Sequence, residues 1–256
     1  MHFDKENIKN NFSRNSSQYS INANIQKQSA KNLCDELIKI FSPKNLSQEL
    51  NILDLGAGTG FIGDYLVKKI PNAKIYELDF SEKMLQNRQN FHPQIKQLIG
   101  DIEDLNFPNK YFDIIISSFS LQWIKDFENL IKKLKIIGKN NFIFAFALPN
   151  SDSFKNLESP FRIIDLPSQN SLENFLLKEN FEEKFLNNQI ILQNFSNPIE
   201  ALKNFKKMGT NYNFYKNNPA NFFDYSKFKK FYLNNYKKNY NFILDWSVSY
   251  LIFELC

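Results

Sequence analysis

The stretch Leu53-Asp-Leu-Gly-Ala-Gly-Thr-Gly60 decides how this 256-residue chain folds. It follows the apolar Ile52, and with Gly63 it holds four of the seven glycines in the chain. Glycine has no Cβ and tolerates positive φ, so the stretch predicts a tight turn from a strand into a helix, with backbone N–H groups facing a ligand. Because glycine is so rare elsewhere, we expect a nucleotide-like cofactor at this turn.

Strands and helices alternate on both sides of the turn. The pattern predicts strands at 50–55, 73–79, 95–99, 112–118 and 141–147, and helices at 60–70, 81–90 and 126–137. Such alternation is typical of an α/β fold, in which right-handed crossovers place helices on both faces of a parallel sheet. The run from Phe112 to Ser117 is apolar enough to be a central buried strand.

Both ends of the chain add elements to this core. Residues 21–41 show helical periodicity and predict one N-terminal helix. After Pro149 the alternation stops. We expect helices at 151–157, 168–179 (with Ser168 as N-cap), 198–207 and 224–238, an extended segment at 185–195, and a last strand from Phe242 to Phe253. The late helices would form a lid beside the ligand edge of the sheet.

Composition excludes some classes of protein. No apolar run approaches the roughly 20 residues of a membrane-spanning helix, and the start lacks the apolar centre of a signal peptide, so we expect a soluble, cytoplasmic protein with no membrane partner. Cys34 and Cys256 have neither metal-ligand spacing nor a disulfide arrangement, and no metal site is expected. The net charge is +5, with lysines crowded into the last quarter of the chain. They indicate either an acidic partner or an AT-biased genome whose lysines solvate helix surfaces.

Polar groups follow four of the predicted strands, where open α/β sheets bind their ligands. They are Asp54 with the glycine turn, Asp79, the Gly100-Asp101-Ile102 segment, and Ser117-Ser118. Each has a structural alternative: Asp79, for example, would cap a helix opened by Ser81, and Asp101 a short turn. Because the four occur in order and in register with the strands, together they favour a cofactor site.

The pattern also narrows the cofactor. The chain lacks the Gly-Lys-Ser/Thr of a P-loop, and its third glycine comes one residue too early for a dinucleotide fingerprint, so a cofactor without phosphates fits better. Residues 50–150 resemble the class I S-adenosylmethionine-dependent methyltransferases, whose loop reads Leu-Asp-Leu-Gly-x-Gly-Thr-Gly. The resemblance implies a seven-stranded, mostly parallel Rossmann-like sheet. It also implies that Asp54, Gly56, Gly58 and Gly60 surround the methionine part of the cofactor, that Asp79 holds the ribose, that Met84, Asp101 and Ile102 contact the adenine, and that Ser117 approaches the sulfonium.

A narrower resemblance extends over nearly the whole chain. The segments Asn11–Tyr19, Phe119–Trp123, Leu202–Thr210 and Val248–Tyr250 look like the malonyl-acyl-carrier-protein O-methyltransferases of biotin synthesis, although 155–200 is divergent and Ile136-Ile137-Gly138 replaces a Pro-Gly turn. The resemblance implies methyl transfer to the free carboxylate of a malonyl thioester, leaving S-adenosylhomocysteine. The partner would be acyl-carrier protein or else coenzyme A, and the crowded lysines would be the docking surface for the carrier protein.

The same resemblance predicts the segments of the chain and the residues of its acceptor site. We expect a single methyltransferase domain over 1–256, with an N-terminal helical cap (1–45), a cofactor-binding core (46–150), a lid and acceptor region (151–238) and a closing strand (239–256). Tyr19 would position the substrate, or else be a packed aromatic anchor. Gln122 and Trp123 would line the acceptor pocket, with Trp123 alternatively in the core. Arg162, Lys206 or Lys207 would pair with the acceptor carboxylate.

The chemistry agrees with the scarcity of histidine, since only His2 and His92 occur and neither is in a plausible catalytic position. A malonyl carboxylate is ionised at neutral pH and needs no general base. Two alternatives remain open: a class I methyltransferase acting on a quinone precursor or another small metabolite, and a cofactor-binding assembly factor without turnover. A nucleic-acid methyltransferase is not expected, because the chain has neither an Asn/Asp-Pro-Pro-Tyr nor a Pro-Cys motif.

Overall fold

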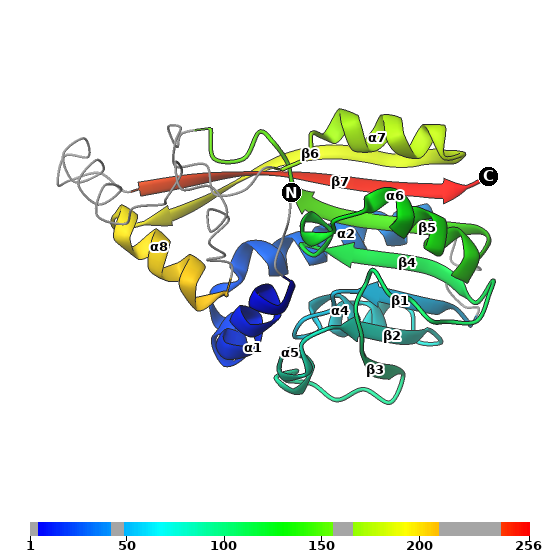
Figure 1. Ribbon diagram of the computed structural model, residues 1–256, viewed down its shortest axis with the longest axis horizontal. Coiled ribbons are helices and arrows are strands. Elements are labelled where there is room, and N and C mark those ends of the chain that lie inside the picture. The colour runs from blue at the N-terminus through cyan, green and yellow to red at the C-terminus, as the bar shows by residue number, and fades with distance from the viewer. Residues whose placement is uncertain (1–4, 42–48, 156–165, 210–241) are drawn as a thin grey trace.

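A seven-stranded sheet with the order β3-β2-β1-β4-β5-β7-β6 forms the centre of the computed structural model (Figure 1). The structure describes residues 5–41, 49–155, 166–209 and 242–256. The strands are β1 (Asn51–Leu55), β2 (Lys74–Asp79), β3 (Ile95–Ile99), β4 (Phe112–Ser118), β5 (Gly138–Pro149), β6 (Phe181–Phe195) and β7 (Phe242–Leu255). Neighbouring strands from β3 to β5 are parallel, and β7 runs antiparallel to both β5 and β6. This confirms the mostly parallel α/β fold.

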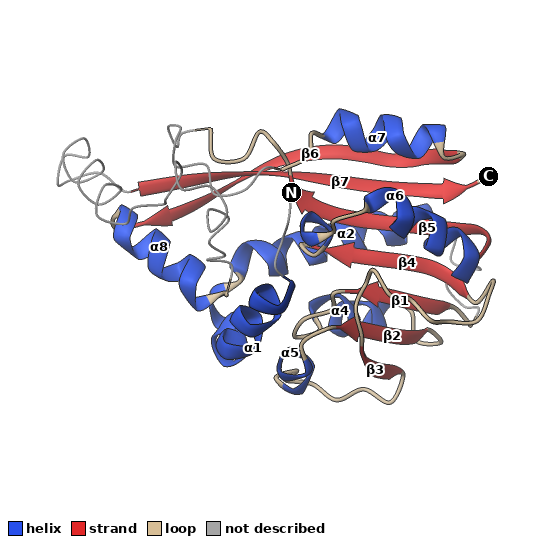
Figure 2. Cartoon of the chain, in the orientation of Figure 1, coloured by secondary structure: helices blue, strands red, loops and turns tan. Residues whose placement is uncertain are grey.

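Helices cover both faces of the sheet (Figure 2). They are α1 (Lys5–Asn22), α2 (Asn24–Ile40), α4 (Phe61–Lys69), α5 (Glu82–Gln86), α6 (Phe127–Ile137), α7 (Gln169–Lys178) and α8 (Pro198–Lys207), with a 3₁₀ turn η1 (Leu121–Trp123). On one face Leu33 of α2 and Leu66 of α4 pack with Ile52 of β1. On the other, Leu134 of α6 packs with Ile115 of β4. Alternate strand residues therefore enter two cores, which is why the central strands are apolar on both sides.

Side-chain caps fix where several helices begin. The Ser168 hydroxyl accepts from the Ser171 N–H at 3.1 Å and opens α7, which confirms the predicted cap. Asp126 accepts from the backbone of Asn129 at 2.9 Å at the start of α6. Asn197 caps α8 in the same way, ahead of a proline in the first turn. Each cap satisfies an N–H group that lacks a partner within its own helix.

The N-terminal region differs from the prediction of one helix over 21–41. It forms two helices, α1 and α2, which meet at Ala23 (φ −86°, ψ 49°). The sequence of α1 is rich in asparagine and serine, which are poor helix formers, and it carries few apolar residues, so its periodicity is weak. The cap of the cofactor site therefore begins earlier in the chain than the pattern indicated.

Three other helices predicted from the sequence each have a different outcome in the structure. The helix expected at 81–90 ends at Gln86, because the chain turns there toward β3. Residues 151–155 form turns rather than the start of a helix, and the helix expected at 224–238 lies outside the described residues. Within the part of the chain that the structure describes, every helix is too short or too polar to cross a lipid bilayer.

Helices α1 and α8 lie at the carboxyl ends of the parallel strands (Figure 1). They are side by side: Gly209, just after α8, approaches the backbone of Asn11 and Phe12 so closely that a Cβ there would lie 2.8 Å from the Asn11 oxygen. In α8, Phe205 is buried while Lys203, Lys206 and Lys207 are exposed, so its apolar side faces the protein. The two helices thus close the end of the sheet at which α/β proteins bind ligands.

Candidate active site

The glycine loop bends back onto the end of β2. Gly56, Gly58 and Gly60 have φ values of 74°, 58° and 85°, a region that other residues rarely adopt. The N–H groups of Gly56 and Ala57 donate to the Leu78 carbonyl at 2.8 and 3.1 Å. A Cβ at Gly56 would overlap the Ser120 side chain, which donates a hydrogen bond to the Gly56 carbonyl at 3.0 Å. The loop is therefore held in the conformation that its glycines predict.

Asp79 ends β2 directly beneath this loop. One carboxylate oxygen accepts from the Gly58 N–H at 2.9 Å, and the other accepts from the Ser81 N–H at 2.8 Å. Burial raises the pKa of Asp79 to about 6, although these two N–H groups act in the opposite direction. The structural role considered from the sequence is thus present, and the same carboxylate also lines a cavity.

Asp101 follows β3 and meets the N-terminal helix. One of its oxygens accepts from Lys5 Nζ at 2.6 Å and the other from the Glu103 N–H at 2.9 Å. Lys5 also pairs with Glu103. Ile102 lies beside this ion pair in the same cavity. Lys5 therefore occupies a hydrogen-bonding position that the sequence assigned to an adenine amino group.

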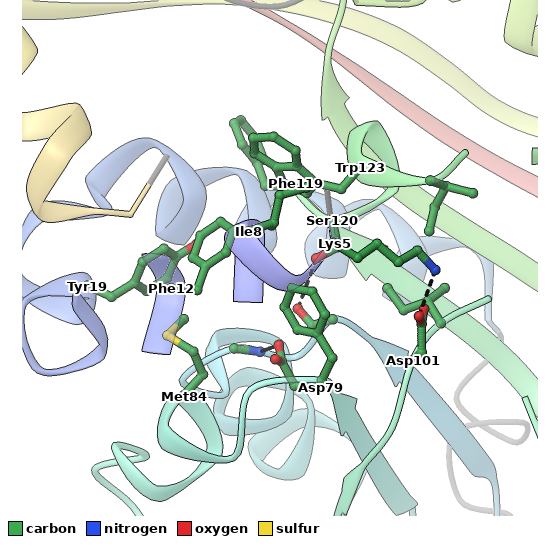
Figure 3. Close-up of a pocket in the computed structure, with 15 residues that line it drawn as sticks. Lys5, Ile8, Phe12, Tyr19, Asp79, Met84, Asp101, Phe119, Ser120 and Trp123 are labelled. Carbon is green, nitrogen blue, oxygen red and sulfur yellow. Dashed lines mark hydrogen bonds and ion pairs between the residues drawn. The ribbon is translucent and has the colours of Figure 1, made fainter. Parts of the chain in front are cut away.

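These groups surround a cavity, which we call the donor cavity (Figure 3). Its lining residues come from α1, the glycine loop, α5, η1 and the ends of β2, β3 and β4: Lys5, Ile8, Phe12, Tyr19, Gly56, Gly58, Asp79, Phe80, Met84, Asp101, Ile102, Phe119, Ser120, Trp123 and Ile124. Gly58 lies close to Met84, since a Cβ there would be 3.3 Å from the methionine methyl. The cavity has the composition of a nucleoside site: apolar and aromatic walls with acids at two strand ends.

Three residues that the sequence assigned to the cofactor lie outside the donor cavity. Asp54 is 1% exposed, neither of its oxygens has a hydrogen-bond partner, and burial followed by the nearby Glu77 raises its pKa well above the usual range. Ser117 donates to the Leu55 carbonyl at 2.8 Å and so joins β4 to β1. Gly60 begins α4. These three residues therefore support the loop and the strand ends from positions outside the donor cavity.

Arg88 supports the loop from the same side, a role that the sequence did not reveal. Its side chain is 7% exposed and pairs with Glu77, which is 0% exposed, and with Asp64. It also donates to the Gly60 carbonyl at 3.4 Å. An acid inside a predicted apolar strand, Glu77, was the signal for a buried cation.

A second cavity, which we call the acceptor cavity, adjoins the donor cavity and shares part of its lining. Its lining is almost entirely aromatic and apolar: Phe12, Tyr19, Gln26, Phe119, Gln122, Trp123, Pro149, Phe154, Leu166, Phe205 and Trp246. Phe12, Tyr19, Phe119 and Trp123 line both cavities. Gln122 and Trp123 therefore lie where an acceptor pocket was expected. Lys206 and Lys207 are exposed on α8 and do not line it, and Arg162 lies outside the described residues.

Tyr19 lies between the two cavities. Its ring stacks on Phe61 with centroids 6.1 Å apart and meets Phe12 edge-on at the same distance. Burial, and next the charge of Asp79, raise the pKa of Tyr19, so its hydroxyl stays neutral and able to donate a hydrogen bond. Tyr19 therefore packs against other aromatic rings and also lines both cavities. The anchoring role and the substrate-positioning role considered from the sequence are compatible with each other.

Polar contacts fasten α1 over the donor cavity at several loops. Ser20 donates to Thr59 of the glycine loop at 2.9 Å, and Ser16 accepts from Asn87 after α5 at 3.0 Å. The hydroxyls of Ser13 and Ser81 are 2.7 Å apart. With Lys5 at the far end, α1 contacts the loops after β1, β2 and β3, and it forms one wall of the cavity.

The fold is that of a class I S-adenosylmethionine-dependent methyltransferase, and the donor cavity lies at the ligand end of its sheet. Residues 52–140 match the family described as "Methyltransferase domain". Among solved structures, a putative methyltransferase from Bacillus halodurans superposes with a TM-score of 0.61 at 13% identity, covering 87% of this chain and 97% of the other. A Haemonchus contortus phosphoethanolamine N-methyltransferase in complex with S-adenosyl-L-methionine does so with a TM-score of 0.55 at 15% identity, covering 88% and 52%.

Comparison with curated sequences narrows the class. Malonyl-acyl-carrier-protein O-methyltransferase 1 of Ilyobacter polytropus is 30% identical over 81% of this chain and 79% of its own length. Malonyl-acyl-carrier-protein O-methyltransferase 2 of the same organism is 29% identical over 93% and 91%. The chain belongs to the malonyl-acyl-carrier-protein O-methyltransferase family.

Proposed function

We propose that this protein methylates the free carboxylate of a malonyl thioester on acyl-carrier protein, using S-adenosylmethionine, in an early step of biotin synthesis. The observation that carries the proposal is the pair of adjoining cavities with Tyr19, Phe119 and Trp123 in the walls of both. Methyl transfer needs donor and acceptor to meet in line, and two cavities sharing one wall provide that arrangement. The family supplies the identity of the acceptor.

The residues of the donor cavity fit the cofactor. A loop of positive-φ glycines brings the backbone close to a ligand, and the Asp79 carboxylate at the end of β2 suits ribose hydroxyls. Met84 and Ile102 would pack on the adenine, and Asp101 would accept from its amino group in exchange for Lys5. The rings of Phe12, Tyr19 and Trp123 offer π faces to the positive sulfonium.

The other residues that were assigned to the cofactor lie outside the donor cavity. Asp54, Gly60 and Ser117 would hold the loop and the strand ends in place rather than touch the cofactor, because Asp54 is buried, Ser117 bonds to the Leu55 carbonyl and Gly60 begins α4. The raised pKa of Asp54 agrees with this, since a buried ionised carboxylate without a partner would be strongly unfavourable.

The chemistry asks little of the protein beyond orientation and exclusion of water. When bound, S-adenosylmethionine supplies a methyl group on a sulfonium sulfur, which a carboxylate oxygen takes while the C–S electron pair stays on sulfur and no proton moves. The described residues that line the acceptor cavity include no histidine or carboxylate. A substrate that is already an anion needs no such base.

The carrier protein is the finer part of the proposal. The exposed lysines of α8, Lys203, Lys206 and Lys207, lie on the outer side of a helix whose buried Phe205 lines the acceptor cavity. An acidic carrier docked on them would deliver its thioester close to that cavity, and the charges would chiefly raise the association rate. The lysines at 227, 229 and 230, also proposed for docking, lie outside the described residues.

A transfer assay with isotope-labelled S-adenosylmethionine tests the function. We expect label on malonyl-carrier protein, released by mild base as expected for a methyl ester, and less on carriers with longer dicarboxyl groups. The coenzyme A thioester, tested in parallel, measures what the carrier protein itself adds. Label on a quinone precursor but not on any malonyl thioester would refute the proposal. Tight cofactor binding without any transfer would indicate an assembly factor instead.

A further inference from the structure

Gln26 is a buried polar residue whose position the methyl-transfer chemistry has not yet explained. It lies on α2, lines the acceptor cavity and is 5% exposed. Its Oε1 is buried and has no hydrogen-bond partner. Because buried polar atoms in folded proteins are nearly always paired, an amide with such an atom in a cavity wall is a candidate to contact a ligand, as an acceptor through Oε1 or, once turned, as a donor through Nε2.

A second amide lines the same cavity in a similar state. Gln122 donates from Nε2 to the Phe119 carbonyl at 2.7 Å, and its Oε1 is likewise buried without a partner. The donated bond fixes the orientation of the Gln122 amide. No hydrogen bond holds the Oε1 of Gln26, so its amide can turn about the Cγ–Cδ bond and present Nε2 donors without breaking a bond at that atom.

The helical junction places Gln26 on the same side as Tyr19. The Ala23 N–H donates to the Tyr19 carbonyl at 2.9 Å, and the Lys27 N–H donates to the Ala23 carbonyl at 3.0 Å, so helical hydrogen bonding continues between α1 and α2. The backbone leaves the helical region at Ala23 (φ −86°, ψ 49°), so helix periodicity does not relate the two side chains, but the cavity does. Both side chains line the acceptor cavity, one on each side of this junction.

We propose that Gln26 binds the methyl-accepting carboxylate through its amide N–H groups, next to the Tyr19 hydroxyl. The inference rests on the proposed function and deepens it by naming the group that holds the acceptor. Among the described residues that line the acceptor cavity there is no lysine or arginine. Neutral donors orient a carboxylate while leaving its attacking oxygen more nucleophilic than a bound cation would, because they withdraw less charge from it.

Replacing Gln26 by glutamate tests the inference with almost no change in shape. At pH 8 the new carboxylate would repel the substrate and could not donate a hydrogen bond to it. We expect the KM for malonyl-carrier protein to rise about 10- to 100-fold, the change that corresponds to losing one hydrogen bond to a charged group. As the pH is lowered and the introduced carboxylate takes up a proton, the side chain regains a neutral donor, so KM should recover. Gln26→Met removes the donor without adding charge, and its KM should stay high at every pH.

Gln28→Glu is the matched control, because it makes the same charge change on an exposed residue of the same helix. Its KM and pH profile should equal those of the wild type. Titration calorimetry gives a readout apart from turnover. With S-adenosylhomocysteine present, Q26E and Q26M should bind malonyl-carrier protein more weakly than wild type, while all variants bind S-adenosylhomocysteine alone equally.

Two kinds of failure are distinguishable. An active wild type together with unchanged KM and carrier affinity in both Gln26 variants would overturn this inference and leave the proposed function standing. A folded wild type that binds S-adenosylhomocysteine but neither binds nor methylates malonyl-carrier protein would overturn the function, and the inference with it. If Q26E does not fold, Q26M decides, since it leaves the helix neutral.

Discussion

Replacing Arg88 by methionine should destabilise the fold by about 3–5 kcal/mol, the usual result of removing one partner from a buried ion pair. Arg88 is 7% exposed and its partner Glu77 is 0% exposed, so the variant would leave a carboxylate without a counter-charge inside the sheet. In a chain of this size each kcal/mol shifts Tm by about 2–4 °C, and the expected fall is about 6–20 °C.

The matched control is a surface pair. Lys74 and Glu49 have side chains that are 55% and 62% exposed, and their interaction is screened by water. Lys74→Met should therefore cost no more than about 1 kcal/mol. Each variant removes one cation, from two carboxylates for Arg88 and from one for Lys74, and the larger difference between the two sites is burial.

The deficit of Arg88→Met should also depend on pH. Burial raises the pKa of Glu77 above its usual range even though Arg88 lowers it, and without Arg88 that pKa should rise further. A carboxyl whose folded pKa is raised binds more protons in the folded state, so stability falls as pH rises from the unfolded pKa to the folded one. The variant should therefore be closer to wild type at pH 5 than at pH 8.

Urea unfolding at both pH values, followed by circular dichroism, measures these differences. Adding Glu77→Gln to Arg88→Met should recover part of the loss at pH 8, because it removes the unpaired charge. A loss below about 1 kcal/mol for Arg88→Met, or an equal deficit at pH 5 and pH 8, would refute the idea that Glu77 is a buried charge that depends on Arg88.

Two further perturbations address the cofactor loop. Gly56→Ala should lower the free energy of unfolding by about 2–5 kcal/mol, because the alanine would have left-handed backbone strain and would overlap Ser120. Calorimetry should also show weakened binding of S-adenosylhomocysteine. The control Gly100→Ala should destabilise the fold less, because Gly100 does not have a positive φ. Burial raises the pKa of Asp79 to about 6, so the affinity for the cofactor should fall as pH drops through that value. The Asp79→Asn variant should bind the cofactor weakly at every pH. A wild-type affinity that is flat from pH 5 to 8 would contradict ribose binding by this carboxylate.

The centre of the sheet could be predicted closely from the sequence because its strands are buried. Segment 112–118 was predicted with the bounds that β4 has, since an apolar run between turn residues has few other interpretations. Segment 95–99 also has the predicted bounds, although β3 is an edge strand with exposed residues. Helix α1 gave no such signal. Its residues make polar contacts with three loops, and contacts of that kind leave no periodic apolar pattern.

The candidate site was predicted in part, for a related reason. Gly56, Gly58, Asp79 and Asp101 line the donor cavity, because the ends of parallel strands converge whatever their exact register. Asp54 and Ser117 do not, although they also lie near strand ends. Side chains alternate across a strand, so a position near its end does not reveal which face a residue occupies. No role was predicted for Gln26, since a single glutamine in a helix resembles many surface residues.

The aromatic wall between the two cavities affects how kinetic data on this enzyme should be interpreted. Phe12 and Tyr19 border both compartments, so truncating either ring alters the room for the nucleoside and for the thioester simultaneously. Apparent affinities for the two reactants should therefore change in concert in such variants, and a bisubstrate inhibitor spanning both chambers should lose more potency than either half alone.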